Sequence, residues 1–176
     1  MLTTNRKGAI AETAIVHAAV RLGIDVYRPV VEGGRYDLIF FLSGLLIRVQ
    51  CKWAARRGDV IPIRCYSSRR TPSGFLRSPY TPDEVDAIAA YCAELDRCYF
   101  LPLALFGRRI EIQLRLAAPR NNQSARIHWA DDFALERLDL IVERLQGAIA
   151  QLGERGAGSA EVTGSSPVGS IPCEAA

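Results

Sequence analysis

One acid, one amide and one lysine stand in segments of the sequence that otherwise have the pattern of buried strands. Asp37 lies near the start of the apolar run 36–42, and Gln50 and Lys52 lie in the apolar segment 45–53. A charged side chain in such a segment is costly unless it is paired or lines a site open to water. Carboxylate and amide oxygens are ligands of Mg²⁺, and an ammonium group stabilises negative charge that develops on a substrate. This combination is therefore suited to metal-assisted chemistry on an anionic substrate.

The spacing of these residues predicts that they meet. Side chains alternate faces along a strand, so Gln50 and Lys52 project from one face, roughly 6.5–7 Å apart. If Ser43-Gly44 turns a hairpin, residue 38 pairs with 49, and Asp37 comes opposite position 50. The loop length alone brings the carboxylate to the strand that carries the amide and the lysine.

Three interpretations of this arrangement are open from the residues alone. Asp37 and Lys52 form a structural ion pair, or the segment is an edge strand with one half-exposed polar face. In the third interpretation a Mg²⁺ site takes the Asp37 carboxylate, the Gln50 amide oxygen and the Cys51 backbone carbonyl as ligands, with Lys52 beside a metal-bound water or the scissile phosphate. Glu12, at the border of an apolar helix face, either supplies a second carboxylate across the sheet or is a solvated first-turn acid favoured by the helix dipole.

The elements that must hold these residues follow from the hydrophobic pattern. Helical periodicity predicts helices at 6–22 and 131–152, and Thr81-Pro82 is a start signal for a third helix to 95. The last helix has two possible roles, packing on the sheet or self-association. The order predicts an α/β domain with a central sheet flanked by helices. Strands are expected at 24–31, 36–42, 45–53, 60–66, 99–105 and 109–116, the last two as a hairpin around Phe106-Gly107, with loops at 67–81 and 118–126.

Composition limits the class of protein. The 176 residues are 49% hydrophobic, which is enough for one folded domain, expected at 1–152. Residues 153–176 are rich in Gly, Ser, Ala and Pro and predict a mobile tail. The five cysteines include no CxxC pair, which argues against a disulfide framework or a zinc ribbon. No segment has the length and hydrophobicity of a membrane span or a signal peptide, so we expect a cytoplasmic protein.

Basic residues are concentrated in the middle of the chain. The net charge is only +3, yet residues 52–79 hold seven basic side chains and one acid, Asp59, a local balance of +6. Such a block is typical of a surface that binds a polyanion, although a solvated loop whose arginines pair with distant acids has the same composition. The seven are Lys52, Arg56, Arg57, Arg64, Arg69, Arg70 and Arg77.

Several motifs together resemble the PD-(D/E)XK nuclease superfamily. They are KGxxxE in the first helix (Lys7, Gly8, Glu12), YD at 36–37 opening an apolar strand, and VQCK at 49–52 in the next. More narrowly, the chain is similar to the intron-encoded homing endonucleases of that superfamily, over roughly residues 5–150, and Tyr80-x5-Asp86 and His128-Trp129-Ala130 also fit. Two positions depart from the pattern. Tyr36 replaces a proline, and Gln50 replaces an Asp or Glu, which removes one negative charge from the metal site.

The resemblance implies a restriction-endonuclease-like core and site-specific hydrolysis of double-stranded DNA that depends on Mg²⁺ or another divalent cation such as Mn²⁺, in intron homing. A site-specific nuclease with one site per chain must self-associate to cut both strands, so we expect a homo-oligomer, a dimer or a tetramer. A Holliday-junction resolvase, a restriction-type nuclease and a catalytically inactive DNA-binding relative are the alternatives. The implied catalytic residues are Glu12, Asp37, Gln50 and Lys52, with Asp37, Gln50 and Glu12 holding the metal and Arg56, Arg57, Arg69, Arg70 and Arg77 binding DNA.

The tail suggests a genetic context. Residues 164–167, Gly-Ser-Ser-Pro, can be encoded by a nucleotide sequence that resembles the T-arm of a transfer RNA gene. An ordinary flexible tail explains the same residues.

Overall fold

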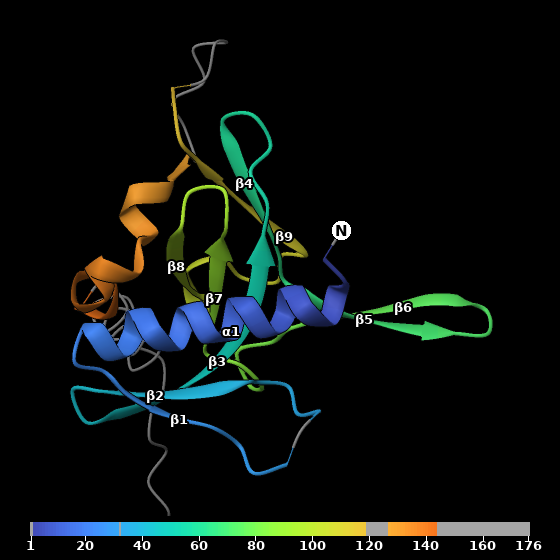
Figure 1. Ribbon diagram of the computed structural model, residues 1–176, viewed down its shortest axis with the longest axis horizontal. Coiled ribbons are helices and arrows are strands. Elements are labelled where there is room, and N and C mark those ends of the chain that lie inside the picture. The colour runs from blue at the N-terminus through green and yellow to red at the C-terminus, as the bar shows by residue number, and fades with distance from the viewer. Residues whose placement is uncertain (1, 32, 119–126, 144–176) are drawn as a thin grey trace, which may run out of the picture.

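The computed structural model describes residues 2–31, 33–118 and 127–143, and Figure 1 shows how their elements are arranged. One long helix, α1 (Thr4–Arg21), is followed by a succession of strands. Thr3 caps the helix by accepting a hydrogen bond from the backbone of Arg6, 3.3 Å away. The strands are β1 (Asp25–Tyr27), β2 (Leu38–Leu42), β3 (Leu45–Ala54), β4 (Val60–Arg64), β5 (Tyr66–Thr71), β6 (Gly74–Pro79), β7 (Ala87–Cys92), β8 (Arg97–Pro102), β9 (Glu111–Arg115) and β10 (His128–Trp129).

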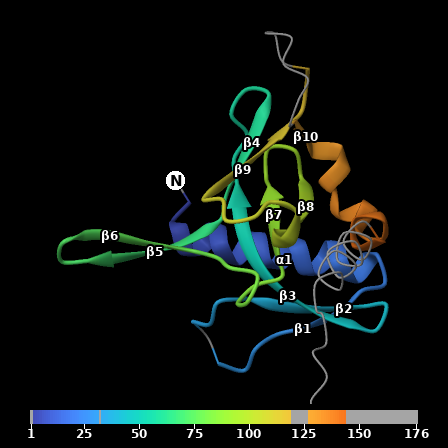
Figure 2. The same cartoon turned by 180° about the vertical axis from the view of Figure 1, so that it is seen from behind.

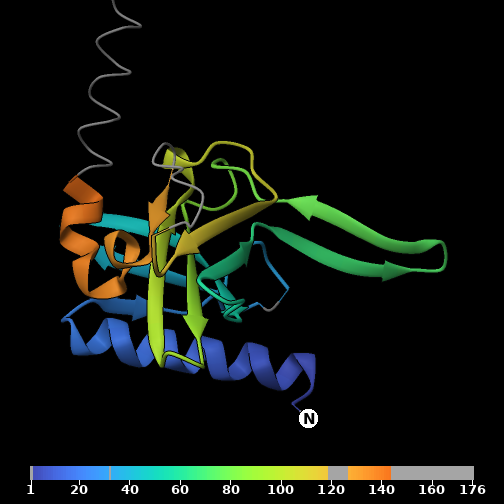
Figure 3. The ribbon, with the colours of Figure 1, turned by 90° about the horizontal axis from the view of Figure 1, so that it is seen from above.

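The centre of the domain is a five-stranded sheet in the order β1-β2-β3-β7-β8. β3 and β7 run parallel, and their other neighbours are antiparallel, so the sheet is mixed. Helix α1 lies across one face, as Figure 1 and the reverse view in Figure 2 show. A second sheet, β10-β9-β4, lies beyond the other face (Figure 3). The expected α/β architecture with a central sheet is confirmed.

The hairpin β2–β3 has the register that the sequence predicted. Leu42 pairs with Leu45 and Leu38 with Val49. Both turn residues have positive φ, 50° at Ser43 and 81° at Gly44, which is the backbone of a two-residue hairpin turn matched to the twist of the strands. β3 is the third of five strands, so the interpretation as a half-exposed edge strand is wrong.

Two apolar clusters lie on the two faces of the sheet. On the α1 side, Ile15 and Ala19 pack with Val49 and Cys51 of β3. On the opposite side, Ile88 of β7 packs with a second group that belongs mainly to β4, β8 and β9. β3 is therefore covered on both faces along most of its length, and a polar side chain on it must have a partner or an opening.

The helix expected at 82–95 is wrong. Only a short turn follows Thr81, whose carbonyl oxygen accepts hydrogen bonds from Glu84 and Val85, each 3.0 Å away. Residues 87–92 form β7, which pairs in parallel with β3. The small alanines that favour a helix locally fit instead between the two packed layers, where a central strand has room only for small side chains.

The loop expected at 67–81 is also wrong, because β5 and β6 pair as an antiparallel ribbon from Tyr66–Pro79 to Thr71–Gly74. Figure 3 shows this ribbon projecting from the body of the protein. Most of its side chains are exposed on both faces, so it lacks the apolar alternation that marks a strand covered on one face.

The hairpin expected around Phe106-Gly107 is wrong too. β8 pairs with β7 in the central sheet, and β9 pairs with β4 in the second sheet. The short 3₁₀ turn Leu103–Leu105 separates them and redirects the chain.

The last expected helix is only partly within the described residues. Two 3₁₀ turns, Ala130–Phe133 and Leu135–Arg137, precede helical residues 138–143. Leu138 and Ile141 are buried in the cluster on the α1 side of the sheet, which confirms the packing role for this part. The rest of that expected helix, most of the loop expected at 118–126 and the tail at 153–176 lie outside the described residues. In the part of the chain that the structure describes, no helix is both long and apolar enough to cross a bilayer.

Candidate active site

Asp37 and Gln50 are in direct contact at the start of β2. The side-chain amide of Gln50 donates a hydrogen bond to Oδ2 of Asp37 and lies 3.3 Å from the backbone carbonyl oxygen of Cys51. The backbone N–H of Cys51 donates to the same Oδ2 over 2.8 Å. Gln50 is 8% exposed and is the one buried polar residue of the described core. The proximity that the hairpin register predicted is confirmed, while the roles of these residues remain predictions.

The chemistry of this cluster fits a hard divalent cation. The carboxylate of Asp37 and the carbonyl of Cys51 both accept from the side-chain nitrogen of Gln50, so the three groups lie together. Rotating the Gln50 amide by half a turn places its oxygen where its nitrogen lies, because the two ends of an amide have nearly the same shape. Three oxygen ligands with one or two carboxylates are a set that Mg²⁺ accepts. No group of three or more His, Cys, Asp and Glu side chains able to hold a metal occurs among the described residues, so such a site depends on neutral oxygens.

Burial raises the pKa of Asp37 above its usual value, and this outweighs the lowering by the Cys51 N–H and by Lys52. The ionised carboxylate is therefore held in an unfavourable environment by the protein alone. A cation beside it would relieve that cost.

Glu12 shares a cavity of about 400 Å³ with Asp37. It projects from the middle of α1, two turns after the helix begins at Thr4, so the interpretation as a first-turn acid is wrong. Its carboxylate lies 3.7 Å from the guanidinium of Arg28, which also lines the cavity. The structure thus brings a second carboxylate to the same opening, as the metal-site interpretation required.

Lys52 lies beside this cluster, next to Tyr80. Its Nζ donates a hydrogen bond to the Tyr80 hydroxyl oxygen over 2.7 Å and lies 4.7 Å from the centre of the ring. Burial lowers the pKa of Lys52, opposed by the charge of Asp37. The ion pairs of the described residues do not include one between Asp37 and Lys52, so the structural ion-pair interpretation is wrong. Burial also raises the pKa of Tyr80 to about 12, so the phenol stays protonated at neutral pH.

A second cavity, of about 530 Å³, opens at Lys52 and is strongly basic. Lys7, Arg57 and Arg64 line it together with Lys52, against one acid, Glu111. The chain has two lysines, and both face this cavity. The cavity is therefore suited to an anionic ligand that reaches Lys52.

The basic residues expected to bind DNA fall into two groups. Arg56 and Arg57 follow β3 directly, and Arg56 lies near Asp59, at 4.0 Å. Arg69, Arg70 and Arg77 are exposed on the ribbon. The ribbon continues the wall of the basic cavity, because Tyr66 and Ser68 of β5 line that cavity.

One face of the ribbon is directed toward the basic cavity and the other is not. Cross-strand partners share a face, so Arg70 and Arg77 lie on the face of Tyr66 and Ser68, toward the basic cavity. Arg69 lies on the other face. The guanidinium of Arg77 lies 5.2 Å from the ring centre of Tyr66.

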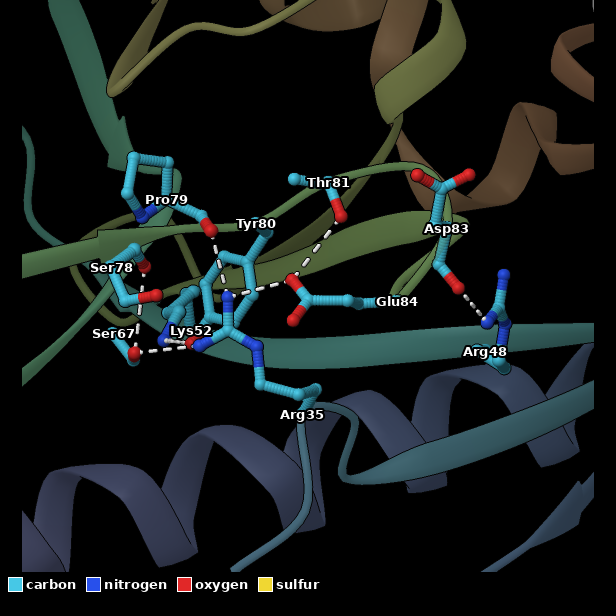
Figure 4. Close-up of polar contacts among 10 residues, drawn as sticks. All are labelled: Arg35, Arg48, Lys52, Ser67, Ser78, Pro79, Tyr80, Thr81, Asp83 and Glu84. Atoms are coloured by element: carbon cyan, nitrogen blue, oxygen red, sulfur yellow. Dashed lines mark hydrogen bonds and ion pairs between the residues drawn. The ribbon is translucent and has the colours of Figure 1, made fainter.

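Two arginines that the sequence left without a role support the site. Arg48 donates hydrogen bonds to the carboxylate of Asp86, from its backbone N–H over 2.7 Å and from its guanidinium over 2.7 and 3.0 Å. This fixes β3 against the start of β7. Arg35 stacks 4.6 Å over the ring of Tyr80 (Figure 4). The Tyr80-x5-Asp86 motif indicated the partners of these arginines, Asp86 for Arg48 and Tyr80 for Arg35. Nothing in the sequence indicated a role for Arg35 itself.

The chain matches both a family of known sequences and known structures. Residues 2–136 match the PD-(D/E)XK endonuclease family. Among solved structures, the chain is similar to a bacterial homing endonuclease, I-Ssp6803I, with 26% sequence identity and a TM-score of 0.63, over 83% of this chain and 97% of that chain. A comparison with curated protein sequences gave no match. The central mixed sheet, with Asp37 and Gln50 on neighbouring strands, is thus a restriction-endonuclease-like core, and the chain belongs to the PD-(D/E)XK endonuclease family.

Proposed function

We propose that this endonuclease hydrolyses phosphodiester bonds of double-stranded DNA at specific sites, with Mg²⁺ or another divalent cation such as Mn²⁺ held by Asp37, Gln50 and Glu12. The observation that carries the proposal is the contact of the Asp37 carboxylate and the Cys51 carbonyl with the Gln50 amide, on the strand that also carries Lys52. When bound, the cation would polarise the phosphoryl oxygens and make water a stronger nucleophile. Glu12 supplies the negative charge that Gln50 lacks.

In this proposal Lys52 acts on the scissile phosphate. Lys52 lines the basic cavity together with Cys51, whose carbonyl belongs to the oxygen cluster. It stabilises the negative charge that develops on the phosphate during attack. Partial burial strengthens this interaction because little water competes for the ammonium.

The basic cavity and the ribbon are proposed to bind the DNA backbone. Arg57 and Arg64 in the cavity and Arg70 and Arg77 on the ribbon form one continuous basic surface that ends at Lys52. Arginine forks suit both phosphate oxygens and the edge of guanine. A two-stranded ribbon is narrow enough to enter the major groove.

The ribbon gives a prediction about affinity. Arg70→Ala and Arg77→Ala are each expected to weaken binding to a mixed-sequence duplex and to reduce the slope of log K against log salt by about 1 per lost phosphate contact. Fluorescence anisotropy between about 50 and 200 mM salt measures both quantities. Arg69→Ala is the matched control, because it removes the same charge from the other face. Equal losses in all three variants would contradict a DNA track on one face.

The test of the proposed function is cleavage of a duplex library with Mg²⁺, with Mn²⁺ and with EDTA. The proposal expects cuts at a restricted set of sequences with either metal and none with EDTA. Binding without cleavage in both metals would instead support a catalytically inactive DNA-binding relative. The observation that favours this alternative is the neutral Gln50 in place of an acid. Preference for four-way junctions over duplexes would support a resolvase.

Intron homing is proposed as the biological role. The support is the similarity to a bacterial homing endonuclease and the Gly-Ser-Ser-Pro sequence at 164–167. The nucleotide sequence around the reading frame tests it. A transfer RNA gene interrupted by an intron that carries the frame supports homing, provided that the uninterrupted gene is cut by the protein and the interrupted one is not.

We also propose a homo-oligomer, a dimer or a tetramer. The described residues of one chain carry one candidate centre, and cutting both strands of a duplex takes two. Phe41, Leu45 and Leu46 at the β2–β3 turn are 40%, 44% and 65% exposed, which is suited to contact between chains. Light scattering is expected to give a multiple of the chain mass of 19.4 kDa. A monomer at micromolar concentration, with and without DNA, would contradict this.

A further inference from the structure

Tyr80 is placed to hold the end of the Lys52 side chain. It follows β6 directly, is 4% exposed, and is fixed by a backbone hydrogen bond of 3.0 Å to the carbonyl oxygen of Cys65. Its hydroxyl oxygen accepts from Lys52 Nζ over 2.7 Å, and its ring lies beneath the same ammonium. A lysine has four flexible bonds and no fixed geometry of its own. A rigid acceptor is therefore what locates its charge.

Arg35 in turn holds Tyr80 and ties it to the ribbon. Its guanidinium lies 4.6 Å from the ring centre and donates to Ser67 Oγ at 2.8 Å and to the Pro79 carbonyl oxygen at 2.7 Å (Figure 4). Ser67 belongs to β5 and Pro79 to β6, so one side chain joins both strands at the base of the ribbon. A third bond, of 2.9 Å, runs to Glu84.

Arg35 also stands two residues before Asp37. The guanidinium thus connects the segment that leads through Asp37 into β2, the base of the ribbon and the ring that contacts the Lys52 ammonium. Five N–H groups in a fixed plane allow one arginine to hold all these partners at once, which a lysine does not.

We propose that Tyr80 and Arg35 are positioning residues that act in series, Arg35 fixing the ring of Tyr80 against the ribbon base and Tyr80 fixing the ammonium of Lys52 for cleavage. The inference rests on the proposed nuclease function. Neither residue touches the scissile phosphate in this account. Both act on the rate through Lys52, because an ammonium group that is already in place needs no ordering during the reaction.

The test compares single-turnover cleavage rates at saturating protein with dissociation constants for the same duplex. Tyr80→Phe keeps the ring and removes only the acceptor, and is expected to lower the rate about 10–100-fold, the range for one hydrogen bond to a charged group. The dissociation constant should change by less than about 3-fold, since the phosphate contacts remain. Tyr91→Phe is the matched control: it removes a hydroxyl that is hydrogen-bonded to Asp96, away from this network, and should leave the rate unchanged.

The serial arrangement is tested by a double-mutant cycle. Arg35→Lys keeps the charge but loses the planar fork, and should lower the rate in the same way. The double variant Tyr80→Phe/Arg35→Lys is expected within about 3-fold of the slower single variant, because both changes break one chain of contacts. Rate losses that multiply would overturn the serial relation. If Arg35→Lys does not fold, as judged by its thermal midpoint, Tyr80→Phe alone still decides whether the hydroxyl matters.

The outcomes separate this inference from the proposed function. If the wild-type protein cleaves no DNA with either metal, the proposed function fails and this inference fails with it. If the wild type cleaves and Tyr80→Phe cleaves at the same rate, only the positioning role fails. If Tyr80→Phe loses affinity in proportion to rate, Tyr80 is part of the binding surface and the positioning role is likewise overturned.

Discussion

Lys52→Ala is expected to lower the rate of DNA cleavage by about 10²–10³-fold, the range for removing one group that stabilises charge in the transition state. The loss should appear in the single-turnover rate, because the ammonium acts on charge that develops during bond breaking. DNA affinity should change little, since Lys7, Arg57 and Arg64 remain in the same cavity. Gel-based cleavage at saturating protein, together with anisotropy binding in EDTA, separates the two effects.

The other lysine supplies the matched control. Lys7 lines the same cavity, and its ammonium lies 5.7 Å from the centre of the Trp53 ring. Lys7→Ala removes the same charge and is expected to weaken binding and reduce its salt dependence, with a cleavage rate close to wild type at saturation. If Lys7→Ala and Lys52→Ala affect rate and affinity in the same proportions, Lys52 is one more phosphate contact and has no special role.

Asp37→Asn is expected to abolish both metal binding and cleavage. Cleavage should fall by at least about 10³-fold, since a metal contributes several kcal/mol to the stabilisation of the transition state. Metal binding has a readout that needs no DNA. At a metal concentration 100 times the dissociation constant, the wild type gains about 2.7 kcal/mol of stability, which is roughly 5–10 °C in thermal midpoint for a chain of this size. Differential scanning fluorimetry with Mg²⁺ or Mn²⁺ should show this rise in the wild type and not in Asp37→Asn.

In the absence of metal, the free energy of unfolding of Asp37→Asn should be no lower than that of the wild type. Burial raises the pKa of the Asp37 carboxyl in the folded state. The stability that this shift contributes is present below the usual pKa and is lost as pH rises through the folded-state value, so at neutral pH the ionised group is a cost. Asp83→Asn is the control for the loss of one carboxylate. Asp83 contacts Arg48 through its backbone carbonyl oxygen, which the substitution keeps. A midpoint that rises with metal in Asp37→Asn would place the metal elsewhere.

The parts of the site that the sequence predicted are those fixed by local geometry. A two-residue turn at Ser43 and Gly44 leaves one register for the hairpin, and that register sets Asp37 against Gln50. The periodic apolar face of α1 was likewise determined by residues that are close together in the sequence. These elements could be predicted because a few neighbouring residues determine them.

The parts that failed depend on distant neighbours. Ala87 and Ala89 favour a helix by propensity, yet both lie in a strand whose position is set by β3 on one side and β8 on the other. Arg35 reaches Glu84 across 49 positions of sequence, and no spacing rule predicts such a contact. The ribbon was missed for a different reason, since a strand exposed on both faces has no hydrophobic period to detect.

The central claim is that Asp37, Gln50 and Glu12 hold a divalent cation beside Lys52. Crystals of the wild-type protein grown or soaked with Mn²⁺ and measured for anomalous scattering test it without any assumption about the DNA target. We expect an anomalous peak within coordination distance of the Asp37 carboxylate and a Gln50 amide turned with its oxygen toward the ion. No peak at millimolar Mn²⁺, or a peak that does not touch Asp37, would contradict it.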